Sequence, residues 1–529
     1  MSVGGVARHG EWDYIVVGGG TAGCILAARL TERPGTTVLL LEAGGEYPGM
    51  ALSVPLPGMR LTTEYSWKYF SCQQPGLANR RISFPMGRIL GGASSTNAMM
   101  YSRGSGGAYD RWSALGCAGW SFADVLPYFR RSENQQHGAS EYHGAGGPVD
   151  VSDIRHRAPF SRAFVEACVE IGMPYNADFN GACQDGAGFF QVTQRRGRRV
   201  TAGEAFLAAA RARHSLTVET NALVCRLVLE GARARGVEYL DRSGERGVAL
   251  SRGEILLSAG TFNSPQILML SGIGPAAHLR AAGIDVRLDL AGVGRNLQDH
   301  LRVPVLYDSG RRSPGDMRNW IPGAIEYALR RRGVMSSNCC ECGAMVRSAS
   351  EAGIPDLQFV THFQSHLYPG TVDLQLCLLH TLSRGSVTLA SADPRTPPVI
   401  DPNYASQPED IRLACFGIRL ARNIAQAPAL RRFPLGNEVL PGADLTADRQ
   451  LELYVRSMAE TCYHPVGTCR MGNDAIAVVD PELRVRGVEG LRVVDASIMP
   501  ELPNGNTAAA TMMIAEKASD LINGVPSPS

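Results

Sequence analysis

Short apolar segments and glycine turns alternate at the start of the chain. Residues 13–17 form an apolar strand pattern that runs into Gly18, Gly19 and Gly20, and residues 22–30 then carry apolar side chains at helical spacing. A second apolar strand follows at residues 38–41 and ends in Glu42. This order predicts a βαβ unit with parallel strands.

The glycines of this unit stand where a dinucleotide-binding loop requires them. Gly18 allows a tight turn, Gly20 lets backbone N–H groups approach a pyrophosphate, and Gly23 lets the helix pack closely on the strand. The helix N-terminus, at Thr21 and Ala22, then faces the phosphate charge. A glycine triplet alone is typical of any tight turn, but the complete order of elements favours dinucleotide binding.

A carboxylate completes the same unit. Glu42 follows the loop glycines by about 20 residues, the spacing at which an acidic side chain accepts hydrogen bonds from ribose hydroxyls. We therefore expect a dinucleotide with a free 2′-OH.

Later apolar segments predict that the nucleotide lobe is discontinuous. Strand patterns at residues 217–230, 254–258 and 491–495 and a helical pattern at 507–522 belong with the opening unit. Helical patterns at 163–171 and 408–425 and strands at 374–382 and 385–390 predict a second lobe. The expected fold is α/β, α+β overall, with a Rossmann-like nucleotide domain (1–105, 200–310, 460–529) and a substrate domain of antiparallel sheet and helices (106–199, 311–459).

Size and charge narrow the function classes. A chain of 529 residues exceeds a single core, so two lobes are expected. The 52 basic and 50 acidic residues nearly cancel, which argues against a nucleic-acid partner. Residues 1–12 lack an apolar signal core, and no apolar run is long enough to span a membrane. We expect a soluble, cytoplasmic protein.

Cysteine usage suggests reduced thiols. The chain has 13 cysteines and no export signal that would favour disulfides. The run Cys339, Cys340, Glu341 and Cys342 lacks a second ligand pair at zinc spacing, so we expect buried thiols on a strand and no metal site.

Four longer motifs resemble the glucose–methanol–choline (GMC) family of flavoprotein oxidoreductases. They lie in family order and cover nearly the whole chain: residues 87–97, 260–274, 292–300 and 464–472. The resemblance implies FAD as the cofactor. It implies FAD contacts at the loop residues and Glu42 named above and also at Arg88, Gly91, Gly92, Ser95, Asn97, Val224, Asp495 and Ala496.

Two positions depart from the family pattern. Ala93 stands where glycine or serine is more usual, and it should still permit close approach of the backbone. Thr96 stands where some members carry a histidine joined covalently to the flavin. Because threonine offers no comparable linkage, we expect FAD to be bound noncovalently.

The resemblance also implies a catalytic pair. Alcohol oxidation needs a base for the hydroxyl proton while flavin N5 takes the hydride, and His464 suits the first task because a neutral imidazole is available near physiological pH. Asn506 could donate to the substrate oxygen as negative charge develops. Taken alone, His464 would be a surface or satisfied core histidine, and Asn506 a turn residue or helix N-cap.

The substrate is less defined by the sequence. Glu341 matches a family position near the substrate cavity and could pair with an ammonium group, although it could equally anchor lobe packing. Residues 175–181 resemble sugar and polyol dehydrogenases of the family. We expect oxidation of a primary alcohol to an aldehyde, with a sugar, polyol or amino sugar (aminoglycoside) in bacterial metabolism as the substrate, and choline or a simple aliphatic alcohol as the alternative.

Other functions and acceptors stay open at this point. The sequence does not distinguish O₂ from another electron acceptor. A redox-inactive nucleotide-binding protein, a lyase that uses FAD without net oxidation and a pyridine-nucleotide dehydrogenase are the remaining alternatives. His464 and Asn506 argue against the first of these, and the segment from 495 to 522, expected to close over an isoalloxazine, argues against the last.

Overall fold

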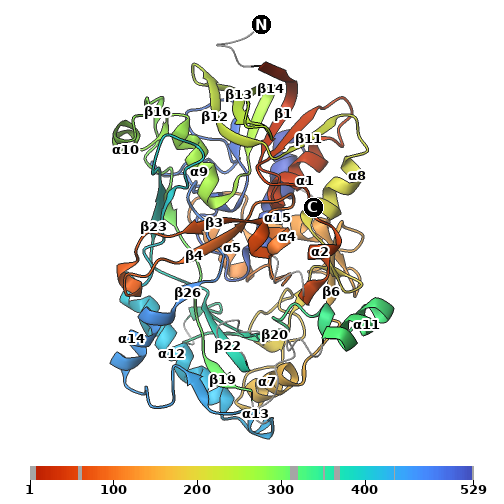
Figure 1. Ribbon diagram of the computed structural model, residues 1–529, viewed down its shortest axis with the longest axis vertical. Coiled ribbons are helices and arrows are strands. Elements are labelled where there is room, and N and C mark those ends of the chain that lie inside the picture. Colours follow the sequence, from red (N-terminus) through yellow and green to blue (C-terminus); the bar gives the residue numbers. More distant parts are fainter. Residues whose placement is uncertain are drawn as a thin grey trace.

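A parallel sheet forms the upper lobe of the protein (Figure 1). The computed structural model describes residues 7–56, 62–309, 320–349, 352–362, 370–433 and 435–526. Five strands run parallel in the order β11-β2-β1-β14-β27. Their bounds are Leu216–Thr220, Val38–Glu42, Ala7–Val17, Arg246–Leu257 and Leu491–Val493. β13 (Arg233–Leu240) and β12 (Leu223–Glu230) extend this sheet in antiparallel fashion.

Buried helices join the two ends of the chain in this lobe. Helix α1 (Thr21–Leu30) has nine of its residues buried, and it packs beside α15 (Thr507–Asn523) (Figure 1). Arg29 of α1 pairs with the fully buried Glu516 of α15 at 2.8 Å, and Arg131 of α6 (Phe122–Ser132) pairs with the same carboxylate. The discontinuous Rossmann-like arrangement predicted from the sequence is confirmed.

An antiparallel sheet forms the lower lobe. Its eight strands follow the order β25-β19-β22-β21-β20-β7, with β18 between β22 and β26. Helices lie on the side of this sheet that faces away from the upper lobe (Figure 1). The strands are β7 (Gly186–Phe189), β18 (Leu301–Val303), β19 (Leu306–Asp308), β20 (Cys342–Val346), β21 (Leu357–His362), β22 (Thr371–Leu378), β25 (Glu438–Leu440) and β26 (Glu460–Thr461), and the helices are α7 (Pro159–Glu170), α12 (Pro408–Ala425), α13 (Pro428–Arg432) and α14 (Asp448–Met458).

Smaller elements complete the fold. The short helices include α2 (Met50–Ser53), α4 (Ala93–Thr96), α5 (Gly106–Ala114), α9 (Gly260–Leu270), α10 (Ala276–Ala281) and α11 (Trp320–Arg330). Short sheets include β3 (Ser66–Phe70) with β4 (Ser83–Gly87), β9 (Gln194–Arg195) with β10 (Arg198–Arg199), and β23 (Gly385–Thr388) with β24 (Val399–Asp401). None of the described helices combines the length and the apolar character needed to cross a membrane.

Some expected elements differ in extent. β1 begins at Ala7, and β22 ends at Leu378, where a strand to residue 382 was expected. Of the cysteine run, only Cys342 lies in a strand, because Cys339 has a left-handed backbone (φ +66°) that interrupts an extended chain. Residues 301–308 and 460–461 were expected in the nucleotide domain, but they supply strands to the antiparallel sheet. The exact domain boundaries stay a prediction.

Candidate active site

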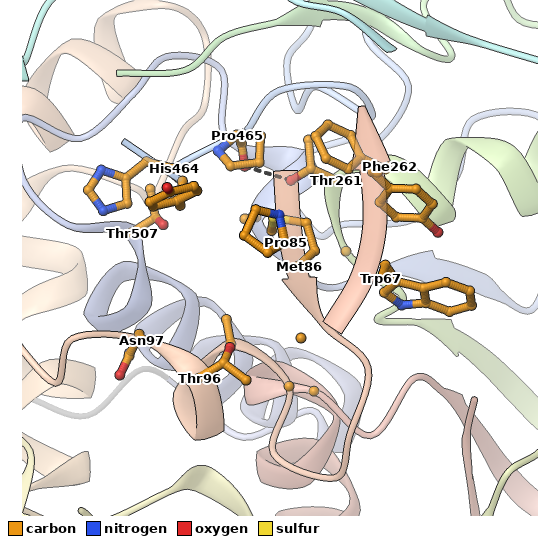
Figure 2. A pocket seen from close by; sticks show the side chains of 18 of the residues that line it. Trp67, Pro85, Met86, Thr96, Asn97, Thr261, Phe262, His464, Pro465 and Thr507 are labelled. Atoms are coloured by element: carbon orange, nitrogen blue, oxygen red, sulfur yellow. Dashed lines mark hydrogen bonds between the residues drawn. The ribbon is translucent and has the colours of Figure 1, made fainter. Parts of the chain in front are cut away.

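A cavity of about 930 Å³ lies between the two lobes. It extends from the glycine loop, at Gly18 and Gly20, to His464 and Asn506. Figure 2 shows His464 on one side of this cavity, Trp67 and Phe262 on the opposite side, and Thr96 with Asn97 on a third wall. The cavity therefore brings together residues from the beginning, the middle and the end of the chain.

The glycine loop has the close contacts that its sequence predicts. Gly18 has φ +100°, and a Cβ on Gly23 would stand 1.9 Å from the carbonyl oxygen of Gly18. A Cβ on Gly20 would instead meet its nearest atoms only at 4.0 Å, and Gly20 and Thr21 line the cavity. Gly18 and Gly23 thus shape the turn, while Gly20 and the start of α1 face open space.

Thr21 carries an unsatisfied polar atom at this end of the cavity. Its Oγ1 is buried and has no hydrogen-bond partner. Buried hydroxyls are normally paired, so the group fits a bound anion at the N-terminus of α1. FAD, whose pyrophosphate would lie there, fits the residues present.

Glu42 ends β2 beside this loop. Its Oε2 accepts a hydrogen bond from the Gly19 N–H at 2.8 Å, and its Oε1 accepts one from the Gly44 N–H at 2.7 Å. Burial raises the pKa of Glu42 to about 7, against the lowering effect of these two donors. Each carboxylate oxygen keeps a lone pair that could accept from a ribose hydroxyl.

The other predicted FAD residues fall into two groups. Gly92, Asn97, Val224, Asp495 and Ala496 line the cavity, as do Ala22 and Thr96. A second group holds the surrounding loops: the Gly91 N–H donates to the Gly19 carbonyl at 2.7 Å, the Ser95 hydroxyl donates to the Leu90 carbonyl at 2.9 Å, and Arg88 stacks on Trp67 at 4.3 Å. Their roles toward FAD stay predictions.

His464 and Asn506 are in direct contact. The Asn506 side-chain amide nitrogen lies 3.1 Å from His464 Nε2, although 42 residues separate the two. Asn506 occupies the N-cap position of α15, yet its side chain makes no capping hydrogen bond, and its Oδ1 is buried without a partner. The amide is therefore directed toward His464 and the cavity instead of toward the helix.

His300 fixes the tautomer of His464. The Nε2 of His300 lies 3.1 Å from the Leu379 carbonyl, which can only accept, so this nitrogen carries the proton. Burial, together with the neighbouring His464, holds the pKa of His300 well below its usual range. Its Nδ1 must therefore accept from His464 Nδ1–H at 3.0 Å, so His464 Nε2 is unprotonated and its lone pair accepts from the Asn506 amide.

Asp299 holds the backbone of His464. Its carboxylate accepts from the His464 N–H at 2.8 Å and from the hydroxyls of Tyr404 and Thr461. Burial raises the pKa of Asp299 to about 6, although these hydroxyl donors lower it. Asp299 and His300 lie in a motif that carried the family resemblance, but their roles were not predicted from the sequence.

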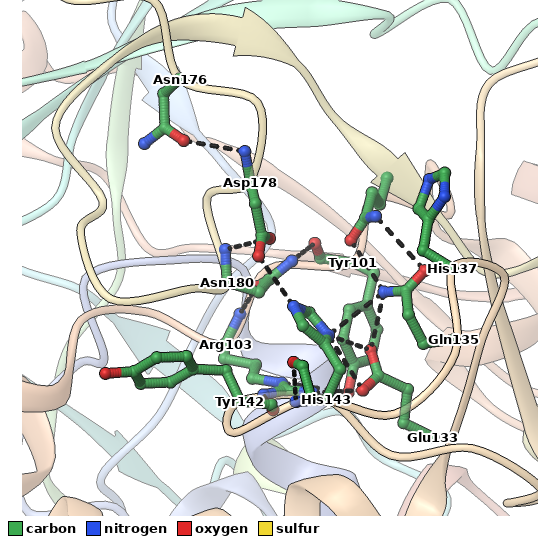
Figure 3. A network of polar contacts seen from close by, with 12 residues as sticks. Tyr101, Arg103, Glu133, Gln135, His137, Tyr142, His143, Asn176, Asp178 and Asn180 are labelled. Carbon is green, nitrogen blue, oxygen red and sulfur yellow. Dashed lines mark hydrogen bonds and ion pairs between the residues drawn. The ribbon is translucent and has the colours of Figure 1, made fainter.

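A second polar network joins Arg103, Glu133, His143 and Asp178 (Figure 3). Arg103 pairs with Glu133 at 2.6 Å, and His143 bridges Glu133 and Asp178 at 3.0 and 2.8 Å. Burial lowers the pKa of His143, but these two carboxylates outweigh burial and raise it to about 9. Nearby, the Ser105 N–H donates to Asn504, two residues before Asn506.

Glu341 does not line this cavity, and the ammonium contact expected for it stays a prediction. Its fully buried carboxylate accepts from His156 Nδ1, the Ala158 N–H, and the hydroxyls of Ser161 and Ser337, at 2.7 to 2.8 Å. Because Ala158 precedes the first residue of α7, the carboxylate stabilises the start of this helix. The neighbouring Cys340 lines the cavity instead.

Replacing Glu341 with glutamine should therefore destabilise the fold without changing substrate choice. The substitution replaces one carboxylate oxygen, a hydrogen-bond acceptor, with an NH₂ group that faces the neighbouring donors. We therefore expect the free energy of unfolding, measured by denaturant titration, to fall by about 1–3 kcal/mol. The ratio of KM values for amino and neutral alcohols should stay constant. Glu166→Gln, at an exposed site on α7, is the control. A selective loss of amino alcohols would restore the ammonium-binding role.

The antiparallel sheet adds a polar wall that was not predicted from the sequence. Arg302 of β18 donates to Gln375 at 2.9 Å and to Glu460 at 2.6 Å, and all three line the cavity. Asp373 lines it as well, and burial raises its pKa to about 7. Donors and acceptors thus face the same space.

Comparisons with known proteins agree with this architecture. Models described as GMC oxidoreductase match residues 12–302 and 381–515. The chain is 42% identical to an alcohol dehydrogenase [acceptor] of Pseudomonas putida, over 97% of this chain and 95% of that protein. It is 40% identical to the mitochondrial choline dehydrogenase of Homo sapiens, over 99% and 91%. A solved FAD-dependent oxidoreductase from Chaetomium thermophilum superposes with a TM-score of 0.90 at 28% identity, covering 97% of this chain and 99% of that one.

Proposed function

The chain belongs to the GMC oxidoreductase family and is an FAD-dependent enzyme that acts on CH–OH donors; from this premise we propose that it oxidises a primary alcohol to an aldehyde at the His464–Asn506 pair. One observation carries the proposal. His464 Nε2 offers a lone pair and Asn506 offers an N–H, side by side at the cavity. An alcohol oxygen, which donates one proton and accepts hydrogen bonds, is complementary to this pair.

The protein side of the reaction follows from these contacts. His464 Nε2 accepts the hydroxyl proton, and the Asn506 amide donates to the oxygen as negative charge develops. His300 keeps the proton on His464 Nδ1, and Asp299 holds the histidine in place. FAD, when bound, supplies the acceptor for the hydride.

The polar wall supports a polyhydroxylated substrate. Arg302, Gln375, Asp373 and Glu460 present donors and acceptors that could bind additional hydroxyl groups of a sugar, polyol or amino sugar. The names of the relatives favour the alternative, choline or a simple aliphatic alcohol. Because Glu341 is enclosed by its own donors, the carboxylates of this wall that a cationic group could approach are those of Asp373 and Glu460.

A panel of alcohols tests the function and the substrate class together. Sugars, polyols, amino alcohols, choline and aliphatic alcohols are added to the holoenzyme under argon, and the loss of flavin absorbance is followed. Bleaching by polyols at lower concentration than by choline or aliphatic alcohols supports the proposal. No bleaching by any alcohol would favour a redox-inactive protein or a lyase. Reoxidation of the reduced enzyme, followed by stopped flow in air, separates O₂ from another acceptor.

FAD should be released completely when the protein unfolds. Thr96 lines the cavity at the position where a covalent linkage would form, and its hydroxyl offers no such linkage. Acid precipitation of the holoenzyme should leave all the flavin in the supernatant, quantified by absorbance and mass spectrometry. A yellow pellet, with FAD mass added to a peptide containing residue 96, would contradict noncovalent binding.

The cytoplasmic location expected from the sequence also stays a prediction.

Activity should be lost as the pH is lowered. Burial lowers the pKa of His464, but Cys462 and Asp299 outweigh burial, so the net pKa lies above the ordinary value of 6.5. The base must be neutral, so kcat/KM should be high above this pKa and be lost as the pH falls through it. Anaerobic flavin reduction against pH measures the midpoint, and flavin fluorescence checks that FAD stays bound. A midpoint below 6.5 would contradict the assignment.

A further inference from the structure

Helix α11 presents an apolar face to solvent. Ile321, Ile325 and Leu329 follow one another at four-residue intervals and are 74%, 57% and 79% exposed. Side chains at this spacing form one stripe along a helix. In Figure 1, α11 lies at the lower right edge of the molecule, away from both sheets. Monomeric proteins rarely expose contiguous apolar surface of this kind without a partner.

The opposite face of α11 accounts for its attachment to the protein. Tyr327 is buried against Leu56, Met335 and Cys339, and its hydroxyl donates to the Gly197 carbonyl at 2.9 Å. A Cβ on Gly323 would approach Val334 to 2.8 Å. The inward face of α11 thus packs on the protein, whereas the three side chains of the outward stripe are not part of the buried core.

Arginines gather at the C-terminal end of this stripe. Arg330 is the last residue of the helix, and Arg331 and Arg332 follow it. The hairpin of β9 and β10 packs against this end, where a Cβ on Gly197 would stand 2.5 Å from the Arg331 carbonyl oxygen. This hairpin and the segment before α7 add the remaining arginines, Arg155, Arg195, Arg196 and Arg198. Among the described residues, only Arg195 of this group has a carboxylate within salt-bridge distance, Asp150. We call the stripe and these arginines the α11 face.

We propose that the α11 face docks onto the surface of an anionic lipid bilayer. Exposed aliphatic side chains flanked by cationic ones are the features by which a helix lies in a membrane interface, with the apolar stripe among the acyl chains and the arginines at the headgroups. A second copy of the chain is a poorer occupant. Joined through this face around a twofold axis, two molecules would bring arginines against arginines.

Docking would place the active-site cavity close to the membrane. Tyr327 and Cys339 belong to one buried apolar cluster, and Cys339 also lines the cavity. The inward face of the docked helix and the cavity wall therefore share this cluster. This surface lies outside the His464–Asn506 pair, so its test does not depend on the proposed reaction.

Vesicle flotation of the full-length holoenzyme tests the proposal. Wild-type protein should float with phosphatidylcholine vesicles that contain about one-third phosphatidylglycerol, and much less with phosphatidylcholine alone. Ile321→Ser combined with Leu329→Ser should weaken binding at least about tenfold, as should Arg330→Gln combined with Arg332→Gln. Binding should also weaken at about 0.5 M salt.

Matched controls separate docking from loss of the fold. Leu453→Ser alters a side chain that is 53% exposed on α14, on the opposite side of the molecule in Figure 1, and it should leave flotation unchanged. Flavin content and activity with a soluble acceptor should be normal in every variant. Equal flotation of wild type and the α11 variants, or no flotation at all, would overturn the proposal. So would a dimer in light scattering that Ile321→Ser with Leu329→Ser converts to monomer.

Discussion

Replacing His464 with alanine should slow reduction of the bound flavin by an alcohol about 10²–10⁴-fold, the usual loss when a positioned base is removed. His464 Nε2 carries the lone pair directed at Asn506, and no other imidazole in the described part of the chain shares that position. Single-turnover stopped-flow under argon measures the rate. The flavin spectrum should stay near that of wild type, because the contacts at the glycine loop are untouched.

A matched histidine variant completes this experiment. His137, which is exposed and pairs with Asp153, lies outside the active-site cavity, so His137→Ala should reduce flavin at the wild-type rate. Near-normal reduction in His464→Ala would remove His464 as the base. Asn506→Ala should cost less, because the base remains, and the double variant should fall short of the product of the two losses, since both act on one oxygen.

The contact between His300 and His464 leads to a related prediction. Because His300 acts through His464, a His300→Gln variant should shift the pH profile of flavin reduction more than it changes KM.

The sequence placed His300 and Asp299 in a family-like motif but did not predict a role for either residue. Their roles depend on β18 lying between β22 and β26, an arrangement made by residues far apart in the chain. The spacing of residues within one segment does not predict which distant strands pair.

The opening βαβ unit was predictable because its constraints are local. Gly18, Gly23 and Glu42 belong to one turn, one helix and the next strand, so the pattern of a single continuous segment predicts that they come together. His464 and Asn506 were predicted from resemblance, and the structure brings their side chains to 3.1 Å. That contact requires the start of α15 to meet the turn after β26, which no single segment encodes.

Glu341 illustrates the opposite case. A single acidic residue beside a glycine matched a family position, but its carboxylate is enclosed by four donors from α7, the segment before α7 and its own loop. The polar wall of Arg302 and Asp373 was missed for a related reason. On alternating strands a charged side chain is typical of a solvent face, and only the opposing lobe turns that face into a cavity wall.

Gly23→Ala should abolish most FAD binding. The added Cβ would stand 1.9 Å from the Gly18 carbonyl oxygen, a backbone atom that can move only if the glycine turn or α1 moves with it. Overpacking of this kind costs about 1–3 kcal/mol, which corresponds to a roughly 5- to 150-fold loss of FAD affinity if the strain is relieved by displacing the loop. The flavin-to-protein absorbance ratio after gel filtration, and titration of the apoprotein with FAD, measure this loss.

Gly45→Ala provides the comparison at a glycine of the same lobe. A Cβ there would meet its nearest atom, Asn221 Oδ1, only at 3.9 Å, and its backbone does not require a positive φ, so FAD content should be that of wild type. Full flavin content in Gly23→Ala would mean that the loop relaxes without disturbing the pyrophosphate site. Thermal unfolding of both apoproteins separates the two routes: a displaced loop lowers FAD affinity with little loss of stability, whereas a displaced α1, which carries the buried contact with α15, lowers both.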